Sequence, residues 1–199
     1  MKLRNLLLVS AMILLASSCS QIAPPSISSP KSLGELITDL KTINKDYDII
    51  KVGINEKDKL TSDFGLVLLD LIKDGENYSQ VLYYNFGIAH NDPKKERASR
   101  NRKEPQPINI ADIEKQQNNV EKYLEDAKKQ ITENFEGYSF NSIGSIEFYI
   151  NDDGNFETKL IVNITEDGNS TRREGGRTVT DYYSLTFLVD GDGNVVYKE

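Results

Sequence analysis

Apolar and polar residues alternate strictly in the C-terminal third of the chain. Between residues 146 and 164 an apolar or β-branched side chain stands at every second position on either side of a polar stretch, 151–155. Residues 183–189 show the same alternation, and a second polar stretch, 190–194, leads to a short apolar segment, 195–197. A period of two is typical of strands with one buried face, and Asp-Gly or Gly-Asn steps favour tight turns. The pattern therefore predicts four strands that form two hairpins.

Three further strands are predicted closer to the N-terminus, at residues 47–54, 64–72 and 78–86. Asp74-Gly75 is a turn signal that connects the second of these to the third. The run 64–72 is densely apolar, which suits a central strand, although a short buried helix has the same composition. Residues 166–177 are polar and rich in glycine, and we expect a loop there.

Helical spacing marks two segments, 32–44 and 110–132. The apolar residues that share one helical face are Leu33, Leu36, Ile37, Leu40 and Ile43 in the first and Ile113, Val120, Leu124, Ala127 and Ile131 in the second. The first segment opens with Ser32 and Glu35, spaced as in a capping box, which predicts that folding begins at Ser32.

The order helix, three strands, linker, helix, four strands indicates the α+β class. We expect two helices packed on a largely antiparallel sheet, with the hypothesis of two similar α-then-β halves. Residues 32–199 would form a single domain, or two lobes, 32–90 and 109–199, joined by a basic linker at 91–108. About 165 residues can bury an adequate core.

The N-terminus has the three parts of a secretory signal. Lys2 and Arg4 supply positive charge, residues 6–15 are almost wholly apolar, and small residues follow. Ten residues of helix span about 15 Å, half of the roughly 30 Å that a bilayer core requires. A cleaved signal peptide at 1–18 is therefore favoured over a permanent transmembrane helix.

The end of this signal, Leu14-Leu15-Ala16-Ser17-Ser18-Cys19, resembles the lipobox of bacterial lipoproteins. The family favours leucine where Ala16 stands. The resemblance implies that Cys19 carries a diacylglyceryl thioether, with cleavage just before it. Ser20, rather than Asp, follows, which in enteric lipoproteins favours the outer over the inner membrane. The alternative is an ordinary cleaved signal followed by an incidental cysteine.

Residues 20–31 are rich in serine and proline, and we expect them to form a tether behind the lipidated Cys19. The formal net charge is −7, and the two cations of the signal make the remainder more acidic still. An acidic domain repels phosphate backbones, so nucleic acid is not an expected partner. Cys19 is the only cysteine, so the folded part is predicted to lack disulfides.

A basic cluster in the linker runs against the overall charge. It consists of Lys94, Lys95, Arg97, Arg100, Arg102 and Lys103. These cations could contact phosphates of lipid headgroups or an acidic partner. A solvated loop, with its positive charge diluted by Glu96 and Glu104, is the favoured interpretation.

The remaining candidates for chemistry have simpler explanations. His90 is the only histidine and lies in a turn-like stretch, which favours an ordinary loop residue over a catalytic or metal-binding one. The alternating Asp and Asn side chains of 151–155 and 190–194 are typical of calcium loops, but the glycine and acidic residues that an EF-hand needs downstream do not follow. Arg172, Arg173 and Arg177 lie in the glycine-rich loop with no spacing that identifies a ligand.

No catalytic, metal-binding or cofactor-binding constellation is therefore predicted. We expect a non-enzymatic lipoprotein, anchored to the cell envelope, that binds an envelope protein or glycan. One alternative is a glycan hydrolase that uses paired carboxylates, which could lie close together in space without any sequence signal. Another is a carrier whose sheet curls around a lipid or other small ligand.

Overall fold

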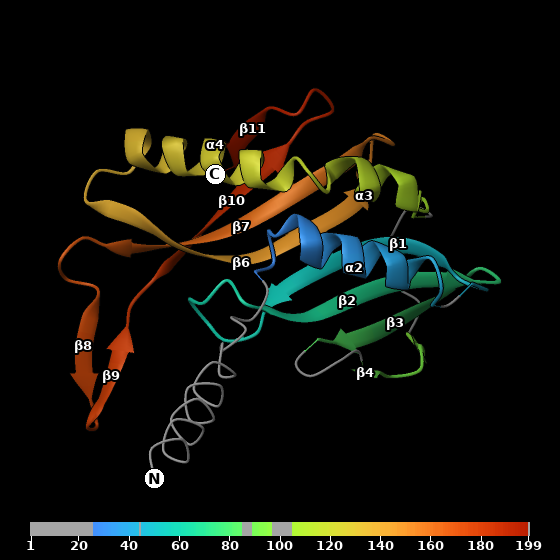
Figure 1. Ribbon diagram of the computed structural model, residues 1–199, viewed down its shortest axis with the longest axis horizontal. Helices are drawn as coiled ribbons and strands as arrows, with labels where there is room; N and C mark the ends of the chain where they lie inside the picture. Colours follow the sequence, from blue (N-terminus) through green and yellow to red (C-terminus); the bar gives the residue numbers. More distant parts are fainter. Residues whose placement is uncertain (1–25, 44, 85–88, 97–104, 199) are drawn as a thin grey trace, which may run out of the picture.

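The computed structural model describes residues 26–43, 45–84, 89–96 and 105–198 (Figure 1). The helices in this part are α2 (Pro30–Leu40), α3 (Ile110–Gln116) and α4 (Val120–Asn134). The first strands are β1 (Asp48–Glu56), β2 (Phe64–Lys73), β3 (Glu76–Tyr83), β4 (Ala89–His90) and β5 (Lys94–Lys95). After the helices follow β6 (Tyr138–Ile150), β7 (Phe156–Glu166), β8 (Thr171–Glu174), β9 (Arg177–Thr180), β10 (Tyr183–Val189) and β11 (Val195–Lys198).

Nine of the described strands form one antiparallel sheet. Its order is β11-β10-β7-β6-β1-β2-β3-β4, and β5 pairs with β3. The middle of the sheet is the pair β1 and β6, which brings residues 51–55 against 145–149 and joins the two parts of the chain. The predicted α+β class and the antiparallel sheet are confirmed.

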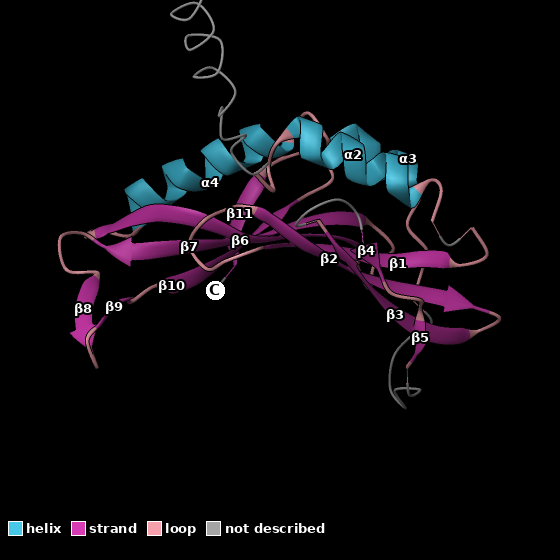
Figure 2. Ribbon diagram, turned by 60° about the horizontal axis from the view of Figure 1, so that its bottom comes forward, coloured by secondary structure: helices cyan, strands magenta, loops and turns pink. Residues whose placement is uncertain are grey.

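The helices all cover one face of this sheet (Figure 2). The core lies between the two layers and is built by one side chain in two along each strand, such as Val52, Leu69, Val162 and Phe187, all at most 1% exposed. At both ends of the view, β8–β9 and β3–β5 bend away from the helices, so the uncovered face lies on the inside of an arch. No helix of the described residues is long and apolar enough to cross a membrane.

Helix α2 begins earlier than predicted. It starts at Pro30, where a fixed φ and a missing N–H suit the first helical turn, and Ser29 is the N-cap without a side-chain bond. The capping box predicted at Ser32 is wrong, because Ser32 is buried inside the helix. Ile27 is fully buried and its N–H donates to the Ser62 carbonyl. Residues 26–31 therefore belong to the folded part rather than to the predicted tether.

The single helix predicted at 110–132 is in fact two, α3 and α4, separated by a turn at 117–119. Gln117 in this turn donates a 2.7 Å hydrogen bond to the Pro30 carbonyl of α2. Asn109 caps α3 by accepting from the Ala111 N–H. The break lets both helices follow the curved sheet.

Two predicted loops contain regular structure. The loop expected at 166–177 includes the hairpin β8–β9, a separate two-stranded sheet whose turn is Gly175-Gly176, with positive φ at both residues. The linker expected at 91–108 contains β5, and near its end Ile108 is buried, with its N–H bonded to the Ile49 carbonyl.

Candidate functional site

No helix of the described residues covers the second face of the nine-stranded sheet, and we call this face the open face. Strand register places these side chains on it: Lys51, Asn55, Leu66, Leu68, Asp70, Val81, Tyr83, Glu147, Tyr149, Glu157, Lys159, Ile161, Thr186, Leu188 and Val196. None of them belongs to the core between sheet and helices.

The two ends of the open face are apolar. On one side Leu68 is 46% exposed and lies opposite Val81, while Tyr83 is 39% exposed and lies opposite Leu66. On the other side Val196 is 54% exposed and lies opposite Leu188. Exposed large apolar side chains that cluster on one surface are typical of contact surfaces.

A row of charges crosses the middle of the open face. The Glu147 carboxylate forms ion pairs with Lys159 at 2.5 Å and Lys51 at 3.0 Å, across three adjacent strands. Burial acts to raise the pKa of Glu147, but the hydrogen bonds and charges of Lys159 and Lys51 outweigh it and hold this pKa below the usual carboxyl range. Glu147 is therefore ionised at neutral pH and is unsuited to act as a general acid.

A buried polar network lies farther along the same three strands. Glu56, at the end of β1, is 7% exposed, and its carboxylate accepts from Asn163 Nδ2 at 3.1 Å and Ser142 Oγ at 3.4 Å. Ser184 Oγ donates to Asn163 Oδ1 at 2.9 Å, and Lys59 Nζ lies 3.5 Å from Glu56. The network connects β1 with β6, β7 and β10, so it couples the two parts of the sheet.

The loop that follows Glu56 is fixed by close packing. The Ile143 N–H donates to Ser62 Oγ at 2.9 Å, which satisfies β6 where β1 no longer pairs with it. A Cβ on Gly65 would lie 2.3 Å from the Lys57 Cα, so this approach requires glycine.

A cleft of about 540 Å³ lies at one end of the sheet. It is bordered by α3, the start of α4, and the turns 151–155 and 190–194, which the sequence places far apart. In both turns one side chain accepts backbone N–H groups: Asn151 Oδ1 from residues 153 and 155, and Asp190 Oδ1 from residues 192 and 194.

These bonds explain the calcium-like pattern without a metal. The Asn194 side chain and the turn amides lower the pKa of Asp190, because they stabilise its carboxylate. Within the described ranges, no three His, Cys, Asp or Glu side chains are grouped so that they could hold a metal ion.

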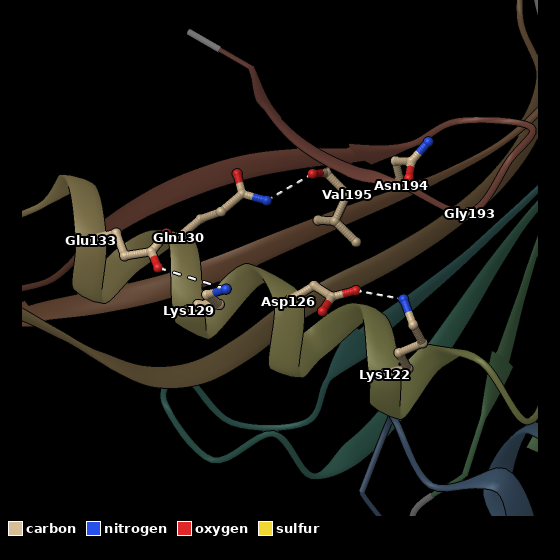
Figure 3. Close-up of a pocket in the computed structure, with 8 residues that line it drawn as sticks. All are labelled: Lys122, Asp126, Lys129, Gln130, Glu133, Gly193, Asn194 and Val195. Carbon is tan, nitrogen blue, oxygen red and sulfur yellow. Dashed lines mark hydrogen bonds and ion pairs between the residues drawn. The ribbon is translucent and has the colours of Figure 1, made fainter.

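A smaller groove of about 270 Å³ runs between α4 and the start of β11 (Figure 3). Its polar groups bond to one another: Lys122 with Asp126 at 2.7 Å, Lys129 with Glu133 at 3.8 Å, and Gln130 Nε2 with the Val195 carbonyl at 2.7 Å. These bonds occupy the groups that a ligand would need.

The structure places few of the sequence-predicted candidates together. Lys94 and Lys95 form β5 at the sheet edge, and Lys95 pairs with Glu76 at 2.5 Å. Cys19, Arg97, Arg100, Arg102 and Lys103 lie outside the described residues. The backbone of His90 pairs with Leu82 in β4. Arg172 pairs with Asp181 and Glu174 along β8–β9.

Sequence reasoning missed the open face, the Glu56 network and the cleft. The alternation of strands showed that each has two faces, but not which face the helices leave bare. Lys51, Glu147 and Lys159 stand at alternating positions of predicted strands, and this signal gains meaning only once the strand order is known.

No protein-family model and no curated protein sequence matches this chain. The function must therefore be argued from the geometry of these surfaces.

Proposed function

We propose that this chain is an envelope lipoprotein, anchored through Cys19, whose domain is a non-catalytic module that binds a protein partner on the open face. The observation that carries the proposal is the exposure of Leu68 and Tyr83 on neighbouring strands of a face without a covering layer. Exposed leucine and tyrosine around a paired charge row match the apolar and aromatic composition of protein interfaces.

Catalysis is less well supported by the same residues. A carboxyl that acts as a general acid needs a raised pKa, which burial without a cationic partner provides. Glu147 on the open face and Asp190 at the cleft have lowered pKa values instead, because each is stabilised as an anion. These side chains suit recognition, where fixed charge orients a partner.

Site-specific photo-cross-linking in the native envelope tests the open face. A photoreactive residue in place of Leu68 should cross-link to one protein partner. The same photoreactive residue in place of Val196 should give an adduct of the same mass. The matched control carries the photoreactive residue in place of Glu125, which is exposed on α4 on the opposite side of the sheet. Equal adducts from Glu125, or adducts from neither open-face position, would refute the proposed binding surface.

The anchor is a separate part of the proposal. Two or three acyl chains hold a protein stably on a bilayer, and the Ser20 context supports the outer membrane. Metabolic labelling with an alkynyl palmitate should tag the protein and should fail for Cys19→Ala. A Cys19→Ala chain that is matured and sediments with membranes as before would contradict the lipid anchor.

We also propose that the chain comprises two related α-then-β halves. The strand order supports this: outward from β1 come β2, β3 and β4, and outward from β6 come β7, β10 and β11. Each series follows a helical segment in the chain. The test is to align the two halves with each other in related sequences. Residues 30–90 should align with 110–198 so that β1 matches β6, and a better match of β1 to β7 would oppose the relation.

A further inference from the structure

We infer that the 540 Å³ cleft at the end of the sheet is a binding site for a neutral oligosaccharide. This site shares Glu157 with the edge of the open face, and the inference does not rest on the proposed protein partner. The volume falls within the roughly 300–1,000 Å³ of small-molecule sites.

The cleft exists because of two departures from regular structure. The chain breaks between α3 and α4 at residues 117–119, and the turns 151–155 and 190–194 extend beyond the strands that they connect. Hydrogen bonds to Asn151 and Asp190 hold both turns in one conformation. A ligand therefore meets groups that are already in place, which reduces the entropy lost on binding.

The lining offers donors and acceptors side by side. Gln116 Oε1 accepts from the Tyr123 hydroxyl at 2.6 Å, which leaves its Nε2 without a partner among the described residues. The same holds for the amide nitrogen of Asn151, whose Oδ1 is used by the turn. Asp112 pairs with Lys115 through Oδ1 at 2.7 Å, and its second oxygen remains an acceptor.

An apolar surface completes the lining. Phe156 borders the cleft and stacks on Phe148 with an interplanar angle of 20° and centroids 6.1 Å apart. Sugar hydroxyls both donate and accept hydrogen bonds, while the C–H groups of a pyranose ring pack on apolar and aromatic side chains. Amides, carboxylates and an aromatic ring around one space match that combination.

Other ligand classes fit less well. Asp112, Glu157 and Asp190 outnumber the single Lys115, which disfavours anions such as phosphates or uronic acids. The absence of a metal-holding group from the described residues disfavours a cation. The many polar side chains disfavour a lipid chain, since it could not satisfy them.

The test is saturation-transfer NMR of the full chain with cellotetraose, maltotetraose and chitotetraose, with tetragalacturonic acid as the anionic comparison. At least one neutral tetrasaccharide should bind with a Kd below about 10 mM and more tightly than the acid. Asn155 and Asp112 line the cleft. Asn155→Ala removes a side-chain amide, and Asp112→Asn replaces a charged acceptor by a weaker neutral one, so each should weaken binding about fivefold.

Two control variants carry the same chemical changes elsewhere. Asn169→Ala alters an exposed asparagine outside the cleft, and Asp126→Asn breaks a helical ion pair in the groove of Figure 3. Both should bind the sugar as the unmodified chain does. The inference is overturned if no neutral tetrasaccharide saturates, if the acid binds as tightly, or if cleft and control variants lose affinity equally.

Discussion

Leu68 and Leu69 are neighbours on β2, yet one is 46% exposed and the other 1%. The pleat directs Leu69 into the core beneath the helices and Leu68 onto the open face. Both residues are leucine, so their apolar character alone does not distinguish them. The difference shows that the tertiary layer above a strand, rather than the strand itself, decides which apolar residues stabilise the fold and which remain available to a partner.

The polar groups of the sheet bond to one another. On the open face Lys51, Glu147 and Lys159 pair across strands, and the Glu56 network satisfies its own members. Polar groups that are paired within the sheet need no covering layer. Water on this face therefore meets paired charges in the middle and exposed apolar side chains at the ends.

The largest expected effect comes from truncating the covered leucine. Leu69→Ala should lower the free energy of unfolding by about 2–5 kcal/mol, because it leaves a cavity in a closed core. Leu68→Ala, the matched variant on the open face, should cost less than about 1 kcal/mol. Urea denaturation followed by circular dichroism measures both. Equal losses would mean that a further segment covers the open face.

Removal of the central amide should have the next largest effect. Asn163→Leu keeps the side-chain size but leaves the Glu56 carboxylate, Ser142 and Ser184 without a shared partner. The expected loss is about 2–3 kcal/mol, because unsatisfied buried polar groups keep their desolvation cost. The control in the same urea experiment is Thr186→Leu, a polar-to-leucine change on the neighbouring strand β10 at a residue outside the Glu56 network. If Asn163→Leu lowers the free energy of unfolding no more than the control does, the Glu56 network does not stabilise the fold.

Much of the fold could be predicted from the sequence because strand periodicity is local. The turns and the strands β7, β10 and β11 were predicted to within about two residues, since alternation and turn chemistry agree there, whereas β6 begins at Tyr138, eight residues before the predicted start at 146. The break between α3 and α4 was missed because Ile113 and Val120 are two helical turns apart and fit one continuous stripe. The Gln117 contact with Pro30 at that break is tertiary, so no local pattern signals it.

The candidate sites were harder to predict than the elements. The turns 151–155 and 190–194 were each recognised, but their common cleft depends on the order β10-β7-β6. Tyr83 and Tyr84 are neighbours in the chain and lie on opposite faces: Tyr83 is exposed, while Tyr84 packs on Phe64. Which face would be covered depends on helix packing, for which the strand sequence carries no signal.

The charge row on the open face should give a smaller effect that depends on pH. Because the pKa of Glu147 is lowered in the folded state, its contribution is complete above the unfolded carboxyl pKa of about 4.3 and is lost as pH falls through the folded value. Glu147→Gln should therefore cost about 1 kcal/mol at pH 7 and progressively less towards about pH 3. Thermal unfolding across this range measures the difference. A constant difference would show that charge is not the cause.

The smallest effect separates the adjacent tyrosines Tyr83 and Tyr84. The Tyr84 hydroxyl donates to Asp39 Oδ2 at 3.0 Å on α2, and burial together with that carboxylate raises the pKa of Tyr84. Tyr84→Phe should cost about 0.5–1 kcal/mol, since water can re-solvate the half-exposed Asp39 once the hydroxyl is gone. Tyr83→Phe should change stability by less than about 0.5 kcal/mol, because its ring is on the uncovered side.

Alkaline titration of tyrosine absorbance at 295 nm gives an independent measure of the same pair. Loss of Tyr84 should remove a hydroxyl that ionises well above the ordinary tyrosine range, because its phenolate would be buried beside the Asp39 carboxylate. Tyr83→Phe should leave the late-titrating absorbance unchanged, including the part that comes from Tyr149, whose pKa is also raised by burial and by Glu157. If Tyr83→Phe reduced the late-titrating absorbance instead, Tyr83 would have to be buried. The open face would then be covered, and the two faces of the sheet would not differ in exposure.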